Sequence, residues 1–156
     1  MPPVMTRWAQ PAMPLVVLFA AWTISGCGSP GGSEAPGYRP VASIDAVMDA
    51  IVIPASQAVF DAVVYENGEL ARAPRTDDEW FRVRMQALAV AEAGNLLMMP
   101  GRAKDSGDWP TFARAMVDAG ESAAHAAESQ DIDRLLHTGG ELYRTCAACH
   151  EKYITP

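Results

Sequence analysis

Apolar side chains recur every three or four residues in four separate segments of the chain, a period that predicts amphipathic helices. These segments span about residues 43–65, 76–99, 108–129 and 131–153. No segment alternates strictly between polar and apolar residues, as a half-buried strand would. Four amphipathic helices joined by modest connections predict an all-α fold, with the helices arranged as an antiparallel, up-down-up-down four-helix bundle.

Proline and glycine mark where this pattern is interrupted. Pro54 should bend the first helix, because proline removes one backbone hydrogen bond and crowds the preceding turn. Residues 66–75 include Asn67, Gly68 and Pro74, and they are expected to form a connection between the first two helices. The glycine pair at 139–140 should bend the last helix or let it lie close to a neighbour.

Capping residues mark the ends of the second and third helices. Thr76 and Glu79 have the spacing of a capping box, and the second helix is expected to end at Met99. Asp108 is the expected N-cap of the third helix, which has Pro110 in its first turn, where a missing N–H costs nothing.

The first 26 residues have the features of a targeting segment. Arg7 precedes an uncharged apolar stretch at 11–22, which is too short to span a bilayer as a mature helix. Residues 24–27 have the sequence ISGC, which resembles the lipobox of bacterial lipoproteins. We therefore interpret residues 1–26 as a lipoprotein signal peptide, with an ordinary secretory signal peptide as the alternative.

The lipobox resemblance implies that Cys27 becomes the N-terminus and carries several acyl chains, which anchor a protein more firmly than one chain does. The residue after Cys27 is Gly28 and not aspartate, and in this respect the chain resembles lipoproteins that are passed to the outer membrane. The expected location is therefore the periplasm-facing surface of a bacterial outer membrane. Residues 27–40 are rich in Gly, Ser and Pro and predict a flexible tether, so the folded domain should span residues 41–156.

The charge of the mature chain limits its partners. Loss of Arg7 with the signal peptide leaves 11 basic and 19 acidic side chains, a formal net charge of −8. Such a surface should not attract nucleic acid or anionic lipid head groups. A partner protein, if there is one, is expected to be basic.

Cys146, Cys149 and His150 form the strongest chemical motif in the chain. Two cysteines at this spacing with a histidine directly after them are the arrangement that forms two thioether bonds to haem and supplies an iron ligand. A disulfide is disfavoured within a regular helix, and a thioredoxin-like pair would lie at the start of a helix after a strand. Zinc would need a further ligand from His125 or His137. The motif therefore predicts one covalent haem c.

The haem motif, followed by Tyr153 at the end of four predicted helices, resembles cytochrome c′ and its low-spin four-helix-bundle relatives. The resemblance covers about residues 41–156, and it departs from many members of the family at Ile154, where they have arginine. It implies a monohaem cytochrome with the haem at the end of the bundle that contains the C-terminus. Because such cytochromes are often dimers, it also allows a homodimer.

The topology of the predicted bundle indicates which side chains surround the haem. The end of the fourth helix should lie near the start of the first helix, the end of the second and the start of the third. His125 and His137 lie about 20 Å along their helices from this end, at about 1.5 Å per residue, and should not reach the iron. The expected pocket residues are Val47, Met48, Ile51, Met98, Met99, Trp109, Phe112 and Tyr153, with Arg102 and Lys104 as possible contacts of the haem propionates.

The sixth iron ligand divides two functional hypotheses. Met48 is the first candidate, with Met98 and Met99 weaker, because a methionine opposite histidine raises the reduction potential and favours electron transfer. Met48 could equally be a flexible core residue. If no methionine binds, the resemblance to cytochrome c′ implies a five-coordinate iron that binds nitric oxide or other small gases.

The leading interpretation is therefore a non-enzymatic electron carrier with an unidentified redox partner protein. One alternative is a binder or scavenger of small gases. The other is a helical lipoprotein that scaffolds an envelope complex and uses its cysteines only for a disulfide.

Overall fold

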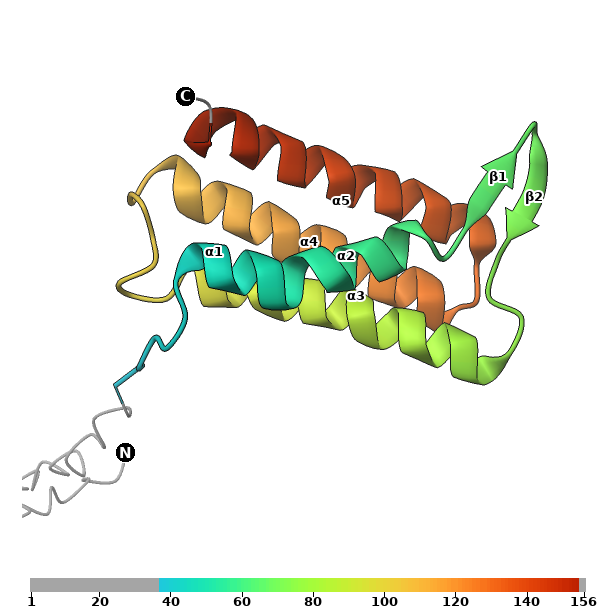
Figure 1. Cartoon of the computed structure of the whole chain (residues 1–156), viewed down its shortest axis with the longest axis horizontal. Coiled ribbons are helices and arrows are strands. Elements are labelled where there is room, and N and C mark those ends of the chain that lie inside the picture. Colours follow the sequence, from blue (N-terminus) through green and yellow to red (C-terminus); the bar gives the residue numbers. More distant parts are fainter. Residues whose placement is uncertain (1–36, 155–156) are drawn as a thin grey trace, which may run out of the picture. The chain divides into compact units, whose positions relative to one another are not determined.

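The computed structural model describes residues 37–154. The signal peptide, Cys27 and most of the predicted tether lie outside the described residues. The described part is all-α apart from one short hairpin (Figure 1). Its elements are α1 (Ile44–Val47), a π-helical turn η1 (Met48–Val52), α2 (Ile53–Phe60), β1 (Val64–Glu66), β2 (Glu69–Arg72), α3 (Asp77–Leu97), α4 (Asp108–Glu128) and α5 (Ile132–Tyr153).

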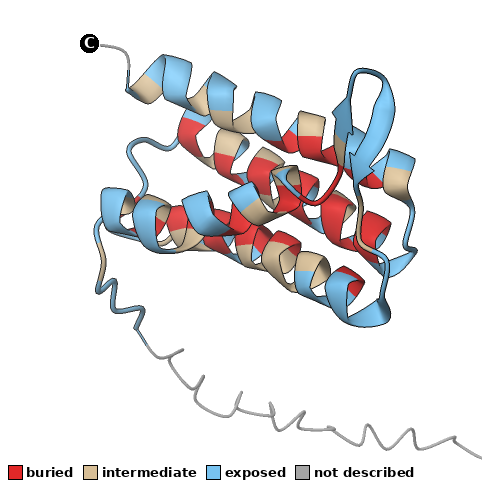
Figure 2. Cartoon of the chain, turned by 45° about the vertical axis from the view of Figure 1, so that its right-hand side comes forward, coloured by how far each residue is buried: buried red, intermediate tan, exposed pale blue. Residues whose placement is uncertain are grey.

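The helices bury one apolar face each. α4 contacts both α3 and α5, and α2 contacts the same two helices from the other side. Figure 2 shows the buried residues on the surfaces that these helices turn toward one another. Much of the core consists of alanine, including Ala87, Ala93, Ala123 and Ala126, none of which has any exposed surface. Small side chains allow the helix backbones to approach closely.

The closest approach is between α3 and α4, where two glycines face the neighbouring backbone. A Cβ atom on Gly120 would lie 2.7 Å from the amide nitrogen of Ala91 and 3.0 Å from the carbonyl oxygen of Ala87. A Cβ atom on Gly94 would lie 2.8 Å from the carbonyl oxygen of Ala113. At each glycine the shortest of these distances is below 3.0 Å, which is closer than a Cβ atom tolerates, so glycine alone fits there without a shift of the backbone.

The first helix is continuous from residue 44 to residue 60, with an irregularity near Pro54. Ser43 caps its start by accepting a hydrogen bond from the N–H of Ala46 at 3.1 Å. At η1 the N–H of Ile53 donates to the carbonyl of Met48, a five-residue step that is typical of a π-helical turn. The sequence predicted a bend at Pro54; the structure has a π-helical turn directly before it, which the sequence did not predict.

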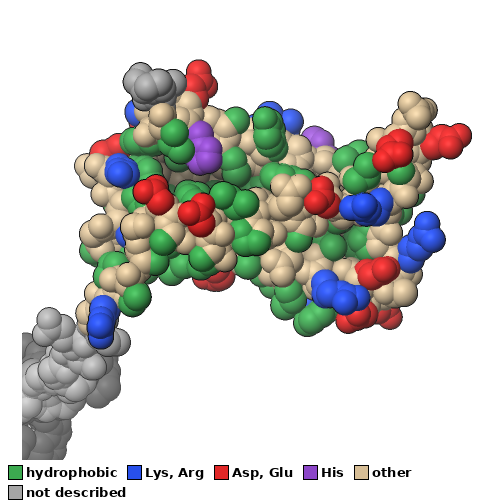
Figure 3. Space-filling view, in the orientation of Figure 1, with side chains coloured by type: hydrophobic (Ala, Val, Ile, Leu, Met, Phe, Trp, Pro, Cys, Tyr) green, Lys and Arg blue, Asp and Glu red, His purple; other side chains and the backbone are tan. Residues whose placement is uncertain are grey.

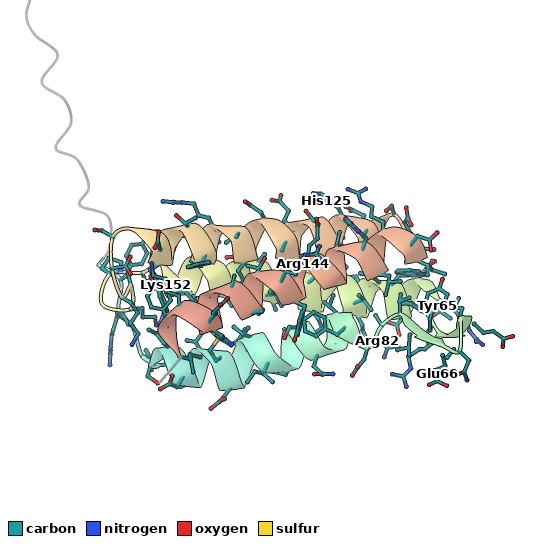
Figure 4. All side chains as sticks on the ribbon, turned by 90° about the horizontal axis from the view of Figure 1, so that it is seen from above. Tyr65, Glu66, Arg82, His125, Arg144 and Lys152 are labelled. Carbon is teal, nitrogen blue, oxygen red and sulfur yellow. The ribbon has the colours of Figure 1, made fainter. Side chains whose placement is uncertain are left out.

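The prediction that this helix continues to residue 65, and that no segment forms a strand, is wrong. Val64–Glu66 pairs in an antiparallel manner with Glu69–Arg72. Asn67 and Gly68 have φ angles of 51° and 84°, the positive values that a tight two-residue hairpin turn requires. The strands are too short to show alternation, and the Asn-Gly pair was the available signal. Figure 4 labels Tyr65 and Glu66 on this hairpin, at the opposite end of the helices from Lys152.

The ends of α3, α4 and α5 agree with the sequence signals to within one or two residues. Thr76 and Glu79 form the predicted capping box. α3 ends at Leu97 rather than Met99. Asp108 is the first residue of α4, and Gly107, which has no capping side chain, takes the N-cap position predicted for Asp108.

Gly139 and Gly140 do not mediate a close helix contact. A Cβ atom on Gly139 would meet only a ring carbon of Phe60, at 3.9 Å, and one on Gly140 only the side chain of Arg144, at 3.6 Å. Both are ordinary van der Waals distances. Among the helices of residues 37–154, none is long and apolar enough to cross a membrane.

The packing at Gly120 generates a stability prediction. Gly120→Ala should lower the free energy of unfolding by about 1–3 kcal/mol, because the added methyl group forces α3 and α4 apart. Gly140→Ala is the matched control: its methyl group has room, and alanine should raise helix stability by about 0.5–1 kcal/mol. Urea unfolding followed by circular dichroism measures both. Equal midpoints for the two variants would contradict the close contact.

Candidate functional site

A cavity of about 260 Å³ opens between the first helix, α4 and the C-terminal half of α5. Its surroundings are apolar, and Figure 3 shows hydrophobic side chains among charged ones on the face over α1 and α5. The lining residues come from four helical segments that are far apart in sequence. They are Met48, Val52, Ile53, Ser56, Phe60, Leu97, Trp109, Phe112, Ala113, Met116, Tyr143, Thr145, Cys146, Cys149 and His150.

The three residues of the sequence motif lie together on one wall of this cavity. Cys146, Cys149 and His150 all project from the last two turns of α5. The two thiols are half-buried and free, and the His150 side chain is exposed. Desolvation by burial raises the pKa of both thiols above the usual value for cysteine. The helix therefore presents two sulfur atoms and one imidazole to the same apolar space.

The opposite walls contain some of the predicted pocket residues. Met48, Trp109 and Phe112 line the cavity, as the helix topology predicts. Met48 projects from the π-helical turn η1, and its side chain is half-buried. These three residues and the motif on α5 are brought together only by the packing of the helices.

A second methionine in the cavity is one that sequence reasoning missed. Met116 lies on α4 one turn after Phe112 and is 5% exposed. It lines the same cavity as His150 and carries a thioether like that of Met48. Its four-residue spacing from Phe112 was the available signal, because residues four apart share a helix face.

Four other predicted pocket residues do not line the cavity. Met98 and Met99 line a separate surface depression with Tyr38, because the chain leaves α3 at Leu97 and turns away. Val47 is buried in the core, and Ile51 packs against that core, since this side of the first helix faces the other helices. Val47 and Ile51 therefore belong to the core and not to the cavity wall, and Met98 and Met99 lie beyond the end of α3.

Arg102 and Lys104 differ in their surroundings. Arg102 is 8% exposed, and its guanidinium donates to the carbonyls of Ala42 and Leu96, each at 3.2 Å. These bonds join the segment before α1 to the end of α3, which is a structural role that the sequence did not indicate. Lys104 is exposed. Neither residue lines the cavity.

Tyr153 packs behind the cavity wall rather than on it. Its ring meets the edge of Trp109 with ring centres 5.0 Å apart, and it meets Phe112 at 6.2 Å. Its hydroxyl donates to a carboxylate oxygen of Asp105 at 2.5 Å. Desolvation and this hydrogen bond raise the pKa of Tyr153 to about 12. Sequence reasoning found Tyr153 but not Asp105.

His125 and His137 lie away from the cavity, as predicted. Both are exposed and lie beside glutamates of their own helices: His125 is within 3.8 Å of Glu121 and His137 within 3.4 Å of Glu141. In the described part of the chain, no three or more His, Cys, Asp or Glu side chains gather in a way that could hold a metal ion. The residues that the structure describes therefore form no preassembled zinc site.

No protein-family model, curated protein or solved structure matches the chain. Any assignment of function therefore depends on the motif, the cavity and the chemistry of the side chains that line it.

The burial of the thiols generates a pH prediction for the chain with both cysteines free. Cys146 and Cys149 should react more slowly with iodoacetamide in the folded protein than in urea, because only the thiolate attacks and their pKa is raised. Mass spectrometry over a pH series gives the rates. Equal rates in the folded and unfolded chain would contradict burial.

The same pKa shift couples stability to pH. A group whose pKa is raised on folding contributes stability that is fully present below its unfolded pKa and lost as the pH rises through the folded pKa. The midpoint temperature of thermal unfolding should therefore decrease as the pH rises above the ordinary cysteine pKa. A variant with both cysteines replaced by serine should show a smaller decrease. The decrease that remains would come from Tyr153, whose pKa is also raised.

Proposed function

We propose that residues 41–156 form a monohaem c-type cytochrome that carries electrons and catalyses no change in covalent bonds. One observation carries the proposal: the two thiols and the imidazole of a haem-attachment motif line the same apolar cavity. A motif that occurred by chance would not be expected to line an apolar cavity with all three of its side chains.

The chemistry of the lining residues fits a haem group. Cys146 and Cys149 would hold it through two thioether bonds, and His150 would bind its iron. The apolar side chains of Leu97, Trp109 and others are suited to the faces of a porphyrin. When bound, haem supplies an iron centre that changes between the ferrous and ferric states. The protein's part is to hold that centre in a largely apolar site, where burial and the ligand set tune its potential.

The same proposal extends to the family. Four helical segments with mutual contacts and a C-terminal haem motif are the features expected of an antiparallel four-helix-bundle cytochrome of the cytochrome c′ type. In support of it, α4 contacts both α3 and α5, while α2 contacts both of these on the remaining side. The motif lies on the last two turns of the final helix, as this family requires.

Two methionines compete for the position opposite His150. Met48 lies on a π-helical turn, a feature that is frequent at functional sites, and it is only half-buried. Met116 is almost fully buried and packs in the core, which is the usual role of a methionine. We therefore propose Met48 as the distal ligand in the electron carrier.

A binder of small neutral gases is the second candidate. It is favoured by the apolar character of the wall opposite α5, where Val52, Leu97 and Ala113 offer no ligand to iron. An iron centre without a sixth protein ligand would leave room there for nitric oxide or carbon monoxide.

We further propose that Cys27 carries the lipid that tethers this domain to the periplasm-facing surface of the outer membrane of a bacterium. The physiological partner would then be a redox protein, and a basic one would complement the acidic net charge of this chain. A homodimer is compatible with the family resemblance.

The haem proposal predicts covalent haem in the full chain when it is produced with the haem-attachment machinery. A pyridine haemochrome spectrum should show two thioether bonds, and replacing Cys146 or Cys149 with serine should leave one. Cys27→Ser is the matched control, because it removes the third cysteine, releases the protein from membranes and should keep the haem. Absence of covalent haem in the native chain would sink both cytochrome hypotheses.

The distal ligand is tested by spin state. If Met48 binds the iron, the native protein should be low-spin, and Met48→Leu should make it high-spin without loss of covalent haem. Met116→Leu is the control, since it removes the other cavity thioether and should leave the spectrum low-spin. A native high-spin spectrum would refute methionine ligation and favour the gas binder. Loss of the low-spin bands only in Met116→Leu would assign the ligand to that residue.

A further inference from the structure

The last turn of α5 is largely exposed: His150 and the two residues after it are exposed, and Tyr153 is half-buried. His150 lies only three residues before Tyr153, where the helix ends. Carbonyls in the last turn of a helix have no intrahelical partner, and helix ends open more readily than helix centres. A side chain that must hold a metal in one orientation therefore needs this turn to be fixed from outside.

Asp105, in the loop between α3 and α4, provides a fixed point beside that turn. One of its carboxylate oxygens accepts hydrogen bonds from the N–H groups of Gly107 at 2.8 Å and Trp109 at 3.1 Å. Its other oxygen accepts the hydroxyl of Tyr153 at 2.5 Å. The side chain therefore caps the start of α4 and holds the end of α5 at the same time.

The aromatic contacts continue this connection into the cavity wall. Tyr153 packs against the edges of Trp109 and Phe112, both of which line the cavity. The indole N–H of Trp109 donates to the carbonyl of Leu97 at 2.8 Å, at the last residue of α3. Asp105, Tyr153 and Trp109 therefore join the ends of three helices where the cavity lies.

We propose that Asp105 is a positioning residue for His150. Its carboxylate holds the hydroxyl of Tyr153, and this bond keeps the last turn of α5, with its histidine, at a fixed orientation to the cavity. The inference rests on the proposed function, because it assigns to Asp105 an effect on the iron ligand. Asp105 itself does not line the cavity.

A second polar contact at the same helix end provides the control. Lys152 pairs with Asp108, joining α5 to the first residue of α4, and Figure 4 labels Lys152 at this end of α5. Both side chains are largely exposed, at 45% and 61%. Exposed ion pairs contribute little. Asp105 is exposed as well, but its carboxylate also accepts two backbone N–H groups, so Tyr153 bonds to an acceptor that is already held in place. Asp105 should therefore matter more than Asp108.

The experiment compares four variants of the full chain by amide hydrogen exchange at residues 149–153. Tyr153→Phe keeps the ring contacts and removes only the hydroxyl, and Asp105→Ala removes the acceptor. Each should speed exchange in this turn by about tenfold or more. Asp105→Asn, which can still cap α4 and form a neutral hydrogen bond to Tyr153, should restore part of the protection. Asp108→Asn should change it by less than about threefold.

The haem-containing variants allow two measurements that a general loss of stability would not change, the reduction potential and the ferric spectrum. In Tyr153→Phe and Asp105→Ala, the reduction potential should shift and the ferric electron paramagnetic resonance spectrum should broaden, because His150 samples more orientations. Asp108→Asn should match the native protein. A Tyr153→Phe variant with native exchange rates, potential and spectrum would overturn the inference.

Failure of the proposed function would look different. If the native chain lacks covalent haem, the cytochrome proposal fails, and so does the assignment of an effect on iron. The exchange rates of that same protein would still show whether Asp105 fixes the last turn of α5.

Discussion

The close contact between α3 and α4 is the constraint on which the rest of the described structure depends. Gly94 and Gly120 leave no room for even one additional carbon atom, and the alanines around them keep the two backbones close. α2 and α5 then pack on this pair. Where the apolar side chains between them do not fill the space, the cavity opens, bordered by Met48 on one side and Cys146 on another. Dense packing in one half of the core therefore coexists with a cavity in the other.

At the end of the bundle that contains the cavity, single polar side chains form hydrogen bonds with more than one segment of the chain. Arg102 donates to carbonyls of two separate segments, and Asp105 accepts from a loop, a helix start and a tyrosine. Trp109 both lines the cavity and bonds to the end of α3. These contacts hold the turn that carries His150 against the neighbouring loop, which the proposed positioning role of Asp105 requires. The residues around a metal ligand set its orientation.

Much of the secondary structure could be predicted from the sequence, because helical periodicity and caps are local properties. The capping box at Thr76 is confirmed. The hairpin was missed because its strands are three and four residues long, too short for a periodic signal. In the site, the sequence correctly placed Met48, Trp109 and Phe112 beside the motif, but it missed Met116 and Asp105 and misplaced Met98 and Met99. A helix wheel gives the face of a helix only to within part of a turn, and one π-helical turn or an early helix end is enough to move a residue out of a cavity.

The sequence by itself determined the helical segments, the capping box at Thr76 and the Cys146-Cys149-His150 motif, since each depends on residues within a few positions of one another. The tertiary structure alone decided which further side chains join that motif and which bonds hold the helix ends around it. It placed Met116 in the cavity, turned Arg102 toward backbone carbonyls and brought Asp105 to Tyr153, which is 48 residues away. The physical reason is that these contacts depend on the distance and rotation between packed helices. Those quantities are set by the packing of the whole core, here by glycines and alanines that carry no chemical signal of their own.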